Sequence, residues 1–391
     1  MLIKISTAKI RNVFELRYDN VLNRGKQTKI VMAVSNDLLT DRRVLRHAEA
    51  LREAGYAVAL VGRRELGVRC KRGWLFYAEY NLRLMVRLLS RKADVVWAND
   101  TDTLLACWLG ARLKGRRLVM DAHELFPEVP EVCDRRFVKW VWATLERVLM
   151  PRCDAMLTVC QSIADYYRQR YGVEMAVVRN ISCGKREVEC NCNQVLPTPH
   201  FSLSSDKMLL YQGCVNEGRC VDWAIDALEW LPGCQLVVAG GGDLLAQMQR
   251  YAASKPWCER VLFTGRLMPD VLENLTRCAA VGLVMLEDRG LSYHFALPNR
   301  IGDFVSAGVP MVVSELPEMA AVVRRFGVGE VMEAPGAKPL AEAIAKVLEQ
   351  WQPLDAAARM ARFAEARADM DWQVEKQKLT ALVPAPCNTN R

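Results

Sequence analysis

The chain has 391 residues, of which 51% are hydrophobic and 25% are charged, with a formal net charge of +8 at pH 7. This composition is typical of globular proteins and excludes a disordered or collagen-like chain, and the length predicts two to three domains of roughly 150 residues. No apolar stretch approaches the roughly 18 residues needed to cross a bilayer, so we expect no membrane-spanning helix.

Residues 1–28 are expected to form a basic arm before the first domain. Charged residues occur throughout "MLIKISTAKIRNVFELRYDN", and no apolar segment leads to a small-residue cleavage site. This pattern is not that of a secretory signal.

Short apolar runs then alternate with amphipathic helical patterns. The segment 41–55 has apolar residues at helical spacing and ends on Gly55, which predicts a helix. Strands are expected at 29–35, 56–62, 94–99, 116–121, 155–160 and 176–180. Strands that alternate with helices are typical of βαβ units and a parallel sheet.

The polar segment 182–207 holds prolines and serines without a sustained hydrophobic period, and it predicts a linker, whose bounds we set at 186–207. Strand patterns restart at 208–213, 234–240, 260–265, 280–287 and 310–315. We therefore expect an α/β protein with two Rossmann-like, doubly wound domains, 29–185 and 208–354, that face each other across a cleft. One long helical pattern at 355–382 follows, and we expect residues 355–391 to pack back on the first domain.

Charge is distributed unevenly between the two halves. Residues 1–200 hold 34 Lys and Arg against 22 Asp and Glu, and the remainder holds 19 against 23. The segments 74–92 and 135–152 are aromatic-rich and basic, which is typical either of interfacial helices on anionic lipid or of core-facing helices with a solvated basic face. Nucleic acid is not expected as a partner, because no recognisable binding motif interleaves the basic residues with aromatic ones.

The 14 cysteines do not form a metal or disulfide framework. They are scattered, the only close pair is Cys190 and Cys192, and no C-x-x-C pair occurs. Reduced, mostly buried thiols in a cytoplasmic protein are expected.

Ligands of open α/β sheets bind beyond the carboxyl ends of the strands, so the residues just after each strand are the candidates. Asn36 and Asp37 follow the first strand, and Asn99 ends the strand before "DTDTLL". In "DAHELFPEVP", His123 and Glu124 follow a strand that we expect to be central. A neutral imidazole at this place can orient a sugar hydroxyl or share a proton.

Two other acids of these segments have structural explanations. Asp41 precedes the first helix and can cap it. The D-x-D of "ANDTDTLL" is a pattern that can hold a divalent metal, but here the acids run straight into a helix, where Asp102 is an ordinary first-turn residue. No metal site is predicted.

Glycine turns follow strands of the second half. In "LLYQGCVNEGRC", Gly213 and Gly218 allow the backbone to come close to a ligand, and Arg219 before the next helix suits a phosphate. The turn "VVAGGGDL" is not a G-x-G-x-x-G that opens a helix, so a dinucleotide site is weakly supported.

"LEDRGLSYHFALPNRIGDFVSAGVP" (286–310) carries a strand end, about ten residues of loop and a short helix. Pro298 is expected as the first helical residue and Gly308 as the end. Asn299, Arg300 and Asp303 share the start of this helix. There Arg300 can hold a diphosphate and Asp303 a ribose hydroxyl pair.

These motifs together resemble a known family. "SNDLLTDRRV", "ANDTDTLL" and "VMDAHELFPEVP" in the first half, with "YQGCVNEGR", "FTGRL" and "LPNRIGDFVSAGVP" in the second, look like a family-four retaining glycosyltransferase. The resemblance covers about residues 29–382, with the motifs in order, and it implies the GT-B fold.

The resemblance implies sugar transfer from a nucleotide-sugar donor, held by the second domain, to a glycan or lipid-linked acceptor on the first. It matches His123 to the histidine near the donor sugar and Arg219 to the basic residue on the diphosphate. Asp303 matches the second acid of the E-x7-E motif, which holds the ribose. Gly265 and Arg266 match the turn beside the base. No cofactor other than the nucleotide-sugar substrate is implied.

The chain departs from the family pattern in two places. Phe295 stands where the first glutamate of the motif is usual, and Arg300 stands where a lysine is common. We expect a cytoplasmic enzyme of surface-polysaccharide or glycolipid synthesis, peripheral on the inner face of an anionic membrane. Two alternatives stay open: a nucleotide-sugar epimerase of the same architecture, and a degenerate member that binds nucleotide or glycan without catalysis.

Overall fold

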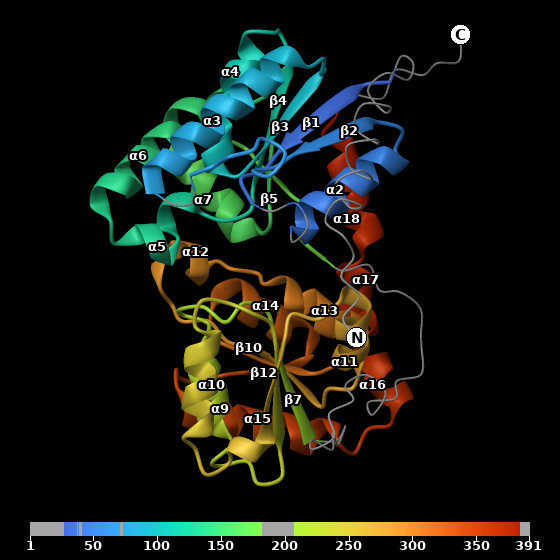
Figure 1. Cartoon of the computed structure of the whole chain (residues 1–391). Helices are drawn as coiled ribbons and strands as arrows, with labels where there is room; N and C mark the ends of the chain where they lie inside the picture. The colour runs from blue at the N-terminus through green and yellow to red at the C-terminus, as the bar shows by residue number, and fades with distance from the viewer. Residues whose placement is uncertain (1–26, 37, 39–40, 71–72, 182–206, 384–391) are drawn as a thin grey trace, which may run out of the picture. The chain divides into compact units, whose positions relative to one another are not determined.

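The computed structural model describes residues 27–383, apart from 37, 39–40, 71–72 and 182–206. The chain divides into two compact units: unit 1 is Met1–Arg179 with Glu375–Arg391, and unit 2 is Asn180–Val374. The predicted basic arm and linker lie almost wholly outside the described residues. Each unit has its own parallel sheet and its own covering helices (Figure 1).

The sheet of unit 1 has six parallel strands in the order β2-β1-β3-β4-β5-β6. Strands β1 to β4 are buried along nearly their whole length, because helices cover both faces of a parallel sheet. The chain reverses its direction of travel across the sheet between β1 and β3, which makes this the topological switch point. The strands are β1 (Lys29–Ala33), β2 (Ala57–Val61), β3 (Val95–Asn99), β4 (Arg117–Ala122), β5 (Ala155–Thr158) and β6 (Ala176–Val177).

The helices of unit 1 form a layer on each side of that sheet. Helix α2 lies on one side, and α3, α4 and α6 pack together on the other (Figure 1). Asp41 caps α2 as predicted, since its side chain accepts a hydrogen bond from the Val44 amide at 3.1 Å. The helical segments are α2 (Arg42–Glu53), α3 (Gly73–Ser90), α4 (Thr101–Arg112), η1 (Phe126–Glu128), α5 (Pro130–Cys133), α6 (Arg136–Leu149), η2 (Met150–Arg152) and α7 (Gln161–Tyr171).

The sheet of unit 2 also has six parallel strands, in the order β12-β11-β10-β7-β8-β9. This is the Rossmann order, with its switch point between β7 and β10. The sequence predicted every strand except β12, whose residues Gly329, Glu330 and Val331 include a single apolar side chain and so form no apolar run. The strands are β7 (Met208–Gln212), β8 (Gln235–Ala239), β9 (Val261–Gly265), β10 (Val281–Val284), β11 (Met311–Val313) and β12 (Gly329–Val331).

Helices cover both faces of the second sheet, with α9 against α10 and α15, and α11 against α13. The predicted fold class, two Rossmann-like doubly wound domains, is confirmed. The helical segments are α9 (Val221–Ala227), α10 (Leu245–Ala253), η4 (Cys258–Arg260), α11 (Pro269–Arg277), α12 (Gly290–His294), α13 (Asn299–Ala307), α14 (Pro317–Phe326) and α15 (Ala337–Trp351).

The single long helix expected at 355–382 is wrong. The segment forms three helices, α16 (Ala356–Arg362), α17 (Ala364–Asp369) and α18 (Trp372–Ala381). Phe363, between the first two, is fully buried in the core of unit 2, and its ring lies 5.3 Å from that of Trp351. Because such contacts fix where the chain turns, tertiary packing overrides the continuous helical pattern.

Of residues 355–391, which we expected to pack back on the first domain, only those from Glu375 onward belong to unit 1. The buried Glu375 carboxylate forms a salt bridge with Arg179 at 2.8 Å. The Tyr56 hydroxyl donates to the Val383 carbonyl, and Lys376 pairs with Glu53. Residues before Glu375, including α16 and α17, belong to unit 2.

The described cysteines at 70, 107, 133, 153, 160, 214, 220, 234 and 258 are free thiols, as expected. Cys278 differs from them because it is disulfide-bonded, which the sequence did not predict. Among the described residues, no helix is both long enough and apolar enough to cross a membrane.

Candidate active site

The first cluster of functional side chains lies at the carboxyl edge of the sheet of unit 1, at its switch point. Asn99 ends β3 and is 1% exposed. Its Nδ2 donates to the Ala33 carbonyl at the end of β1 at 2.8 Å. Its Oδ1 faces His123 Nε2 at 3.3 Å. Asn99 therefore ties the two switch-point strands together and positions the histidine.

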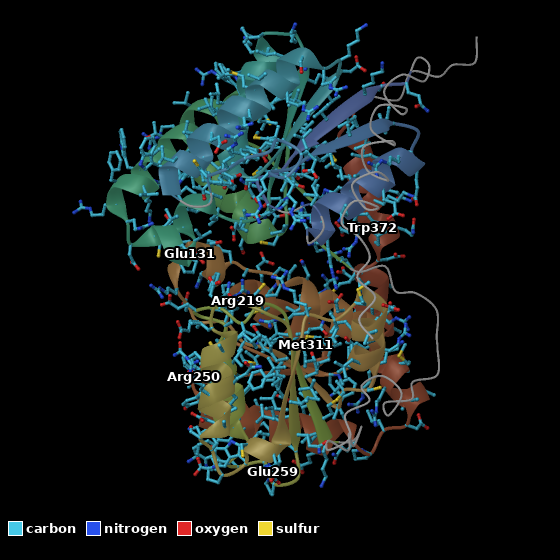
Figure 2. All side chains as sticks on the ribbon, viewed as in Figure 1. Glu131, Arg219, Arg250, Glu259, Met311 and Trp372 are labelled. Atoms are coloured by element: carbon cyan, nitrogen blue, oxygen red, sulfur yellow. The ribbon has the colours of Figure 1, made fainter. Side chains whose placement is uncertain are left out.

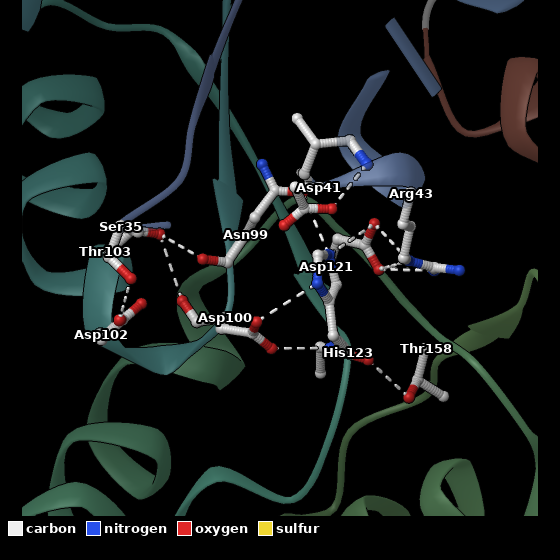
Figure 3. A network of polar contacts seen from close by, with 12 residues as sticks. Ser35, Asp41, Arg43, Asn99, Asp100, Asp102, Thr103, Asp121, His123 and Thr158 are labelled. Atoms are coloured by element: carbon white, nitrogen blue, oxygen red, sulfur yellow. Dashed lines mark hydrogen bonds and ion pairs between the residues drawn. The ribbon is translucent and has the colours of Figure 1, made fainter. Parts of the chain in front are cut away.

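His123 lies among acceptors on both sides of its ring (Figure 3). Nδ1 is 3.3 Å from Asp100 Oδ2, and Nε2 is 3.5 Å from Asp121 Oδ2. Burial alone would lower the pKa of His123, but Asp100 and Asp121 outweigh it and raise the pKa to about 9. The two acids therefore favour the charged form of the ring, whereas the sequence led us to expect a neutral imidazole.

Asp121 is the buried carboxylate with which both Arg43 and His123 pair. It is fully buried, and Arg43 grips it through Nε at 3.1 Å and Nη2 at 2.6 Å, while Arg43 Nη1 donates to the Val178 carbonyl. Burial alone would raise the pKa of Asp121, but Arg43 and His123 together hold it well below its usual range. The acid at the end of β4 thus anchors Arg43 and gives the imidazolium a fixed negative partner.

Asp100 occupies a strained backbone conformation, with φ of 61° in the left-handed region that a residue with a side chain rarely adopts. This turn allows its carboxylate to accept from the His123 backbone amide at 2.7 Å as well as to face the ring. Such strain persists only where the surroundings impose it, and it is often found at functional sites.

Asp102 is not the ordinary solvated first-turn acid that the sequence suggested. It is 5% exposed, Ser35 donates to its Oδ2, and its Oδ1 is buried without a hydrogen-bond partner among the described residues. Burial raises the pKa of Asp102 to about 7. In the described part of the chain, no group of three or more His, Cys, Asp or Glu side chains is arranged to hold a metal ion.

The structure describes three of the four expected acceptor-side residues, and Asn99 has been described above. Asn36 is exposed, and Glu124 is half-buried next to His123. Asp37 lies outside the described residues. Sequence reasoning missed Glu146, which is fully buried behind the cluster and accepts from the Thr101 hydroxyl at 2.7 Å and from two tyrosines. Its single signal was an acid on the apolar face of α6.

The second cluster lies at the carboxyl edge of the sheet of unit 2, and Arg300 occupies its switch point. Arg300 is 6% exposed; its Nη1 donates to the Gln212 carbonyl and its Nη2 to the Met285 carbonyl, each at 3.1 Å. It also stacks over the Tyr211 ring at 4.7 Å. Arg300 thus fixes the ends of β7 and β10, and its Nε is buried without a hydrogen-bond partner in the described region.

Arg219 lies in the loop after β7, on the side of unit 2 opposite to Glu259 (Figure 2). Its guanidinium is held over the Tyr293 ring at 4.8 Å, and its Nε is buried without a hydrogen-bond partner among the described residues. Tyr293 belongs to α12, a short helix within the segment predicted as loop. The ring also packs next to Gly218, where a Cβ would come within 3.1 Å of it.

Asp303, the predicted ribose ligand, is half-buried on α13 and linked to the end of β7. Its Oδ2 accepts from Gln212 Nε2 at 2.8 Å, and Gln212 Oε1 accepts from the Thr276 hydroxyl. This chain of hydrogen bonds fixes the carboxylate near the switch point. Asn299 is exposed at the first residue of α13, and Pro298 is its N-cap rather than its first residue.

Glycines bring backbone segments together at the same edge. A Cβ on Gly240 would lie 1.7 Å from the Gly213 carbonyl oxygen, so the turns after β7 and β8 touch only because residue 240 has no side chain. Gly213 itself has φ of 135°. The exposed Arg266, after β9, lies along Gly241, where a Cβ would be 3.4 Å from its side chain. The predicted donor residues thus follow neighbouring strands of one sheet.

Two family models match the chain in succession. The model described as Glycosyltransferase Family 4 matches residues 40–184, and the model described as Glycosyl transferases group 1 matches residues 206–350. No relative with a curated description matches the sequence.

Solved structures with the same fold cover nearly the whole chain. Sucrose-phosphate synthase from Thermosynechococcus elongatus has a TM-score of 0.71 at 16% identity, covering 91% of this chain and 98% of its own. WaaG, a glycosyltransferase involved in lipopolysaccharide biosynthesis, has a TM-score of 0.69 at 16% identity, covering 90% and 99%. HepE of Anabaena in complex with UDP-glucose has a TM-score of 0.65 at 14% identity, covering 90% and 98%.

Two doubly wound units, matched over nearly the full length by such structures, define the GT-B fold, and the two family models show that the class is that of glycosyltransferases. The two successive family models give the particular family: the chain belongs to the family-four-like glycosyltransferases. The family and the GT-B fold that the sequence motifs predicted are confirmed.

Proposed function

We propose that this glycosyltransferase moves a hexose from a nucleoside-diphosphate sugar to a glycan or glycolipid acceptor, with retention and without a metal ion. The donor is held by unit 2 and the acceptor by unit 1. HepE was solved with UDP-glucose, which supports a nucleoside-diphosphate sugar as the donor class. WaaG is involved in lipopolysaccharide biosynthesis, which supports a role in the cell envelope.

The observation that carries the proposal is the arrangement of Arg219 at the carboxyl edge of a Rossmann sheet. Its guanidinium is fixed over Tyr293 and keeps a buried Nε–H without a partner. A hydrogen-bond donor that is already oriented needs no reorganisation when a diphosphate binds. Hydrogen bonds between a charged guanidinium and a phosphate are stronger than those between neutral groups. Both Nη groups of Arg300 already donate to backbone carbonyls. Arg300 therefore contributes its positive charge to the site and not Nη hydrogen bonds to the diphosphate.

In the proposed reaction, the bond from the anomeric carbon to the β-phosphate oxygen breaks, and the acceptor oxygen bonds to the same face of that carbon. The proton of the acceptor hydroxyl passes to the departing diphosphate. Negative charge therefore grows on the leaving group, where Arg219 stabilises it. Asp303, fixed by Gln212, accepts hydrogen bonds from the ribose hydroxyls. Asn299, Gly213 and Arg266 line the donor site.

His123 has a separate proposed role toward the sugar. Because both ring nitrogens face acceptors in the free protein, the imidazolium is held as a donor and does not act as a nucleophile. We propose that it donates to a sugar hydroxyl in place of its contact to Asn99. Asn36, Asp37 and Glu124 remain proposed acceptor contacts.

We also propose that the enzyme works in the cytoplasm as a peripheral protein on an anionic inner membrane face. The basic, aromatic helices α3 and α6 support this, since each exposes a tryptophan: Trp74 is 76% exposed and Trp140 is 63% exposed. Such helices bind interfaces through apolar contact and attraction to anionic lipid.

The proposed function is tested with purified protein, a panel of nucleotide sugars and product analysis with and without acceptor. We expect a sugar to appear on the acceptor, and turnover with Arg219→Ala to fall by about 100-fold or more, as when one preorganised donor to a developing charge is removed. Arg250→Ala, which removes an exposed arginine of unit 2, is the matched control and should be unchanged.

Two results would overturn the proposal. Conversion of the donor sugar without any acceptor would identify an epimerase. Unchanged kinetics of Arg219→Ala would remove this residue from the donor site.

A further inference from the structure

A cavity of about 390 Å³ lies on unit 1, away from the switch-point cluster, between η1, α5, α6 and α7. Four cations line it and a single acid, Glu128, lies among them. The cations are Arg136, Lys139, Arg147 and Arg170.

The positive charge of this cavity is only partly neutralised. Lys139 forms a salt bridge with Glu128 at 2.7 Å. Arg170 lies over the rings of Tyr166 and Tyr171 at 6.0 and 5.9 Å. Arg136 and Arg147 are exposed and make no ion pair within the part of the chain that the structure describes. The cavity therefore keeps a net positive charge and suits a multiply charged anion.

Helix α6 carries a second feature next to these cations. Arg136, Lys139 and Arg147 recur at helical spacing, and Phe137, Trp140 and Val148 follow the neighbouring line of the helix, which we call the aromatic stripe. Phe137 is 75% exposed, Trp140 is 63% exposed and Val148 is 44% exposed. The Phe137 and Trp140 rings stack on each other at 6.0 Å instead of packing into the core.

We propose that the α6 cavity binds the phosphate headgroup of an anionic membrane lipid while the aromatic stripe enters the interfacial layer of the same membrane. The inference rests on the proposed peripheral membrane association and assigns it a built site. A phosphate dissolved in water would gain nothing from exposed phenyl and indole rings, whereas a lipid presents its phosphate directly above apolar chains. The charge of the cavity and the stripe next to it thus fit one ligand.

The test is vesicle co-sedimentation of the full chain with phosphatidylcholine vesicles, with and without phosphatidylglycerol. Arg136→Gln/Arg147→Gln should bind the anionic vesicles about 30-fold more weakly, since each basic residue near an anionic surface contributes about 1 kcal/mol. Arg112→Gln/Lys114→Gln, which removes two exposed charges at the end of α4, is the matched control and should bind like the parent protein.

A second pair of variants tests the aromatic stripe. Trp140→Ala should weaken binding to anionic vesicles, and Trp230→Ala, which removes a 45% exposed tryptophan of unit 2, should not. All four variants alter exposed side chains, and heat stabilisation by the nucleotide-sugar donor verifies that unit 2 is intact. If no nucleotide sugar stabilised the parent protein, the proposed function would be refuted, but the proposed lipid site would be unaffected.

Three outcomes would overturn the lipid site. Equal loss in the α4 control would show that binding is diffuse electrostatic attraction. Release of the parent protein from vesicles by inorganic phosphate at the headgroup concentration would identify a soluble anion as the ligand. Full recovery of the parent protein in the soluble fraction at low salt would show that no membrane is bound.

Discussion

The buried pair of Arg43 and Asp121 gives the sharpest prediction for stability. Replacing Arg43 by methionine keeps most of the apolar volume but removes the guanidinium that grips Asp121 through Nε and Nη2. The partners are 3% and 0% exposed, so water cannot replace the lost donors. We expect Arg43→Met to leave a buried carboxylate that has lost its hydrogen-bonded guanidinium and keeps only the nearby histidine rings as partners.

Breaking a buried pair by removing one partner costs about 3–5 kcal/mol. His47 Nδ1 lies 3.1 Å and His123 Nε2 3.5 Å from Asp121 Oδ2, and these rings offset part of the loss. We therefore expect the lower end, about 3 kcal/mol, which lowers the Tm of unit 1 by about 6–12 °C at roughly 2–4 °C per kcal/mol for a domain of this size. Replacing both partners, as Arg43→Met/Asp121→Asn, should recover most of the stability.

The defect should depend on pH. With Arg43 present, the pKa of Asp121 is held below its usual value, and this stabilisation is lost only as the pH falls. Without Arg43, burial raises the folded pKa above the unfolded one. The folded state then takes up a proton, and stability is lost as the pH rises through that raised pKa. Differential scanning calorimetry at pH 5 and pH 8 should therefore show a larger defect for Arg43→Met at pH 8.

The reasoning would be refuted if Arg43→Met lowered the Tm of unit 1 by less than about 2 °C, a loss of under 1 kcal/mol. It would also be refuted if the double variant were no more stable than the single one. Either result would mean that Asp121 is solvated or neutral in the folded protein.

Three further outcomes follow from the two clusters. Because the pKa of His123 is raised to about 9, its charged ring stabilises unit 1 fully below its unfolded pKa of about 6.5. Both this stability and kcat/KM should fall as the pH rises through about 9; a pH–rate profile that falls near 6.5 would contradict a charged ring. Gly240→Ala should destabilise unit 2 by about 1–3 kcal/mol, since its Cβ would lie 1.7 Å from the Gly213 carbonyl oxygen. Gly241→Ala, whose Cβ would lie 3.4 Å from the Arg266 side chain, should lower the melting temperature far less. Asp303→Asn should weaken nucleotide-sugar binding by about 10-fold, corresponding to loss of a charge-assisted hydrogen bond; equal affinity in calorimetric titration would exclude the ribose role.

The sequence alone determined the parts of this protein that depend on local pattern. Runs of apolar residues bounded by glycine turns predicted every strand except β12, because a parallel sheet covered on both faces requires strands that are apolar throughout. The rule that ligands bind past the carboxyl ends of strands also selected His123, Arg219 and Asp303 as candidates, without any knowledge of their neighbours.

Only the tertiary structure decided which side chains face one another. Arg43 and Asp121 are 78 residues apart, and Thr101 and Glu146 are 45 apart, so no local pattern could pair them. The charge of His123, the buried Asp102 and the basic cavity of α6 follow from such long-range contacts. Periodicity indicates which face of a helix or strand is buried. The pKa of a buried side chain, however, depends on the charged groups around it, and folding brings these together from distant parts of the chain.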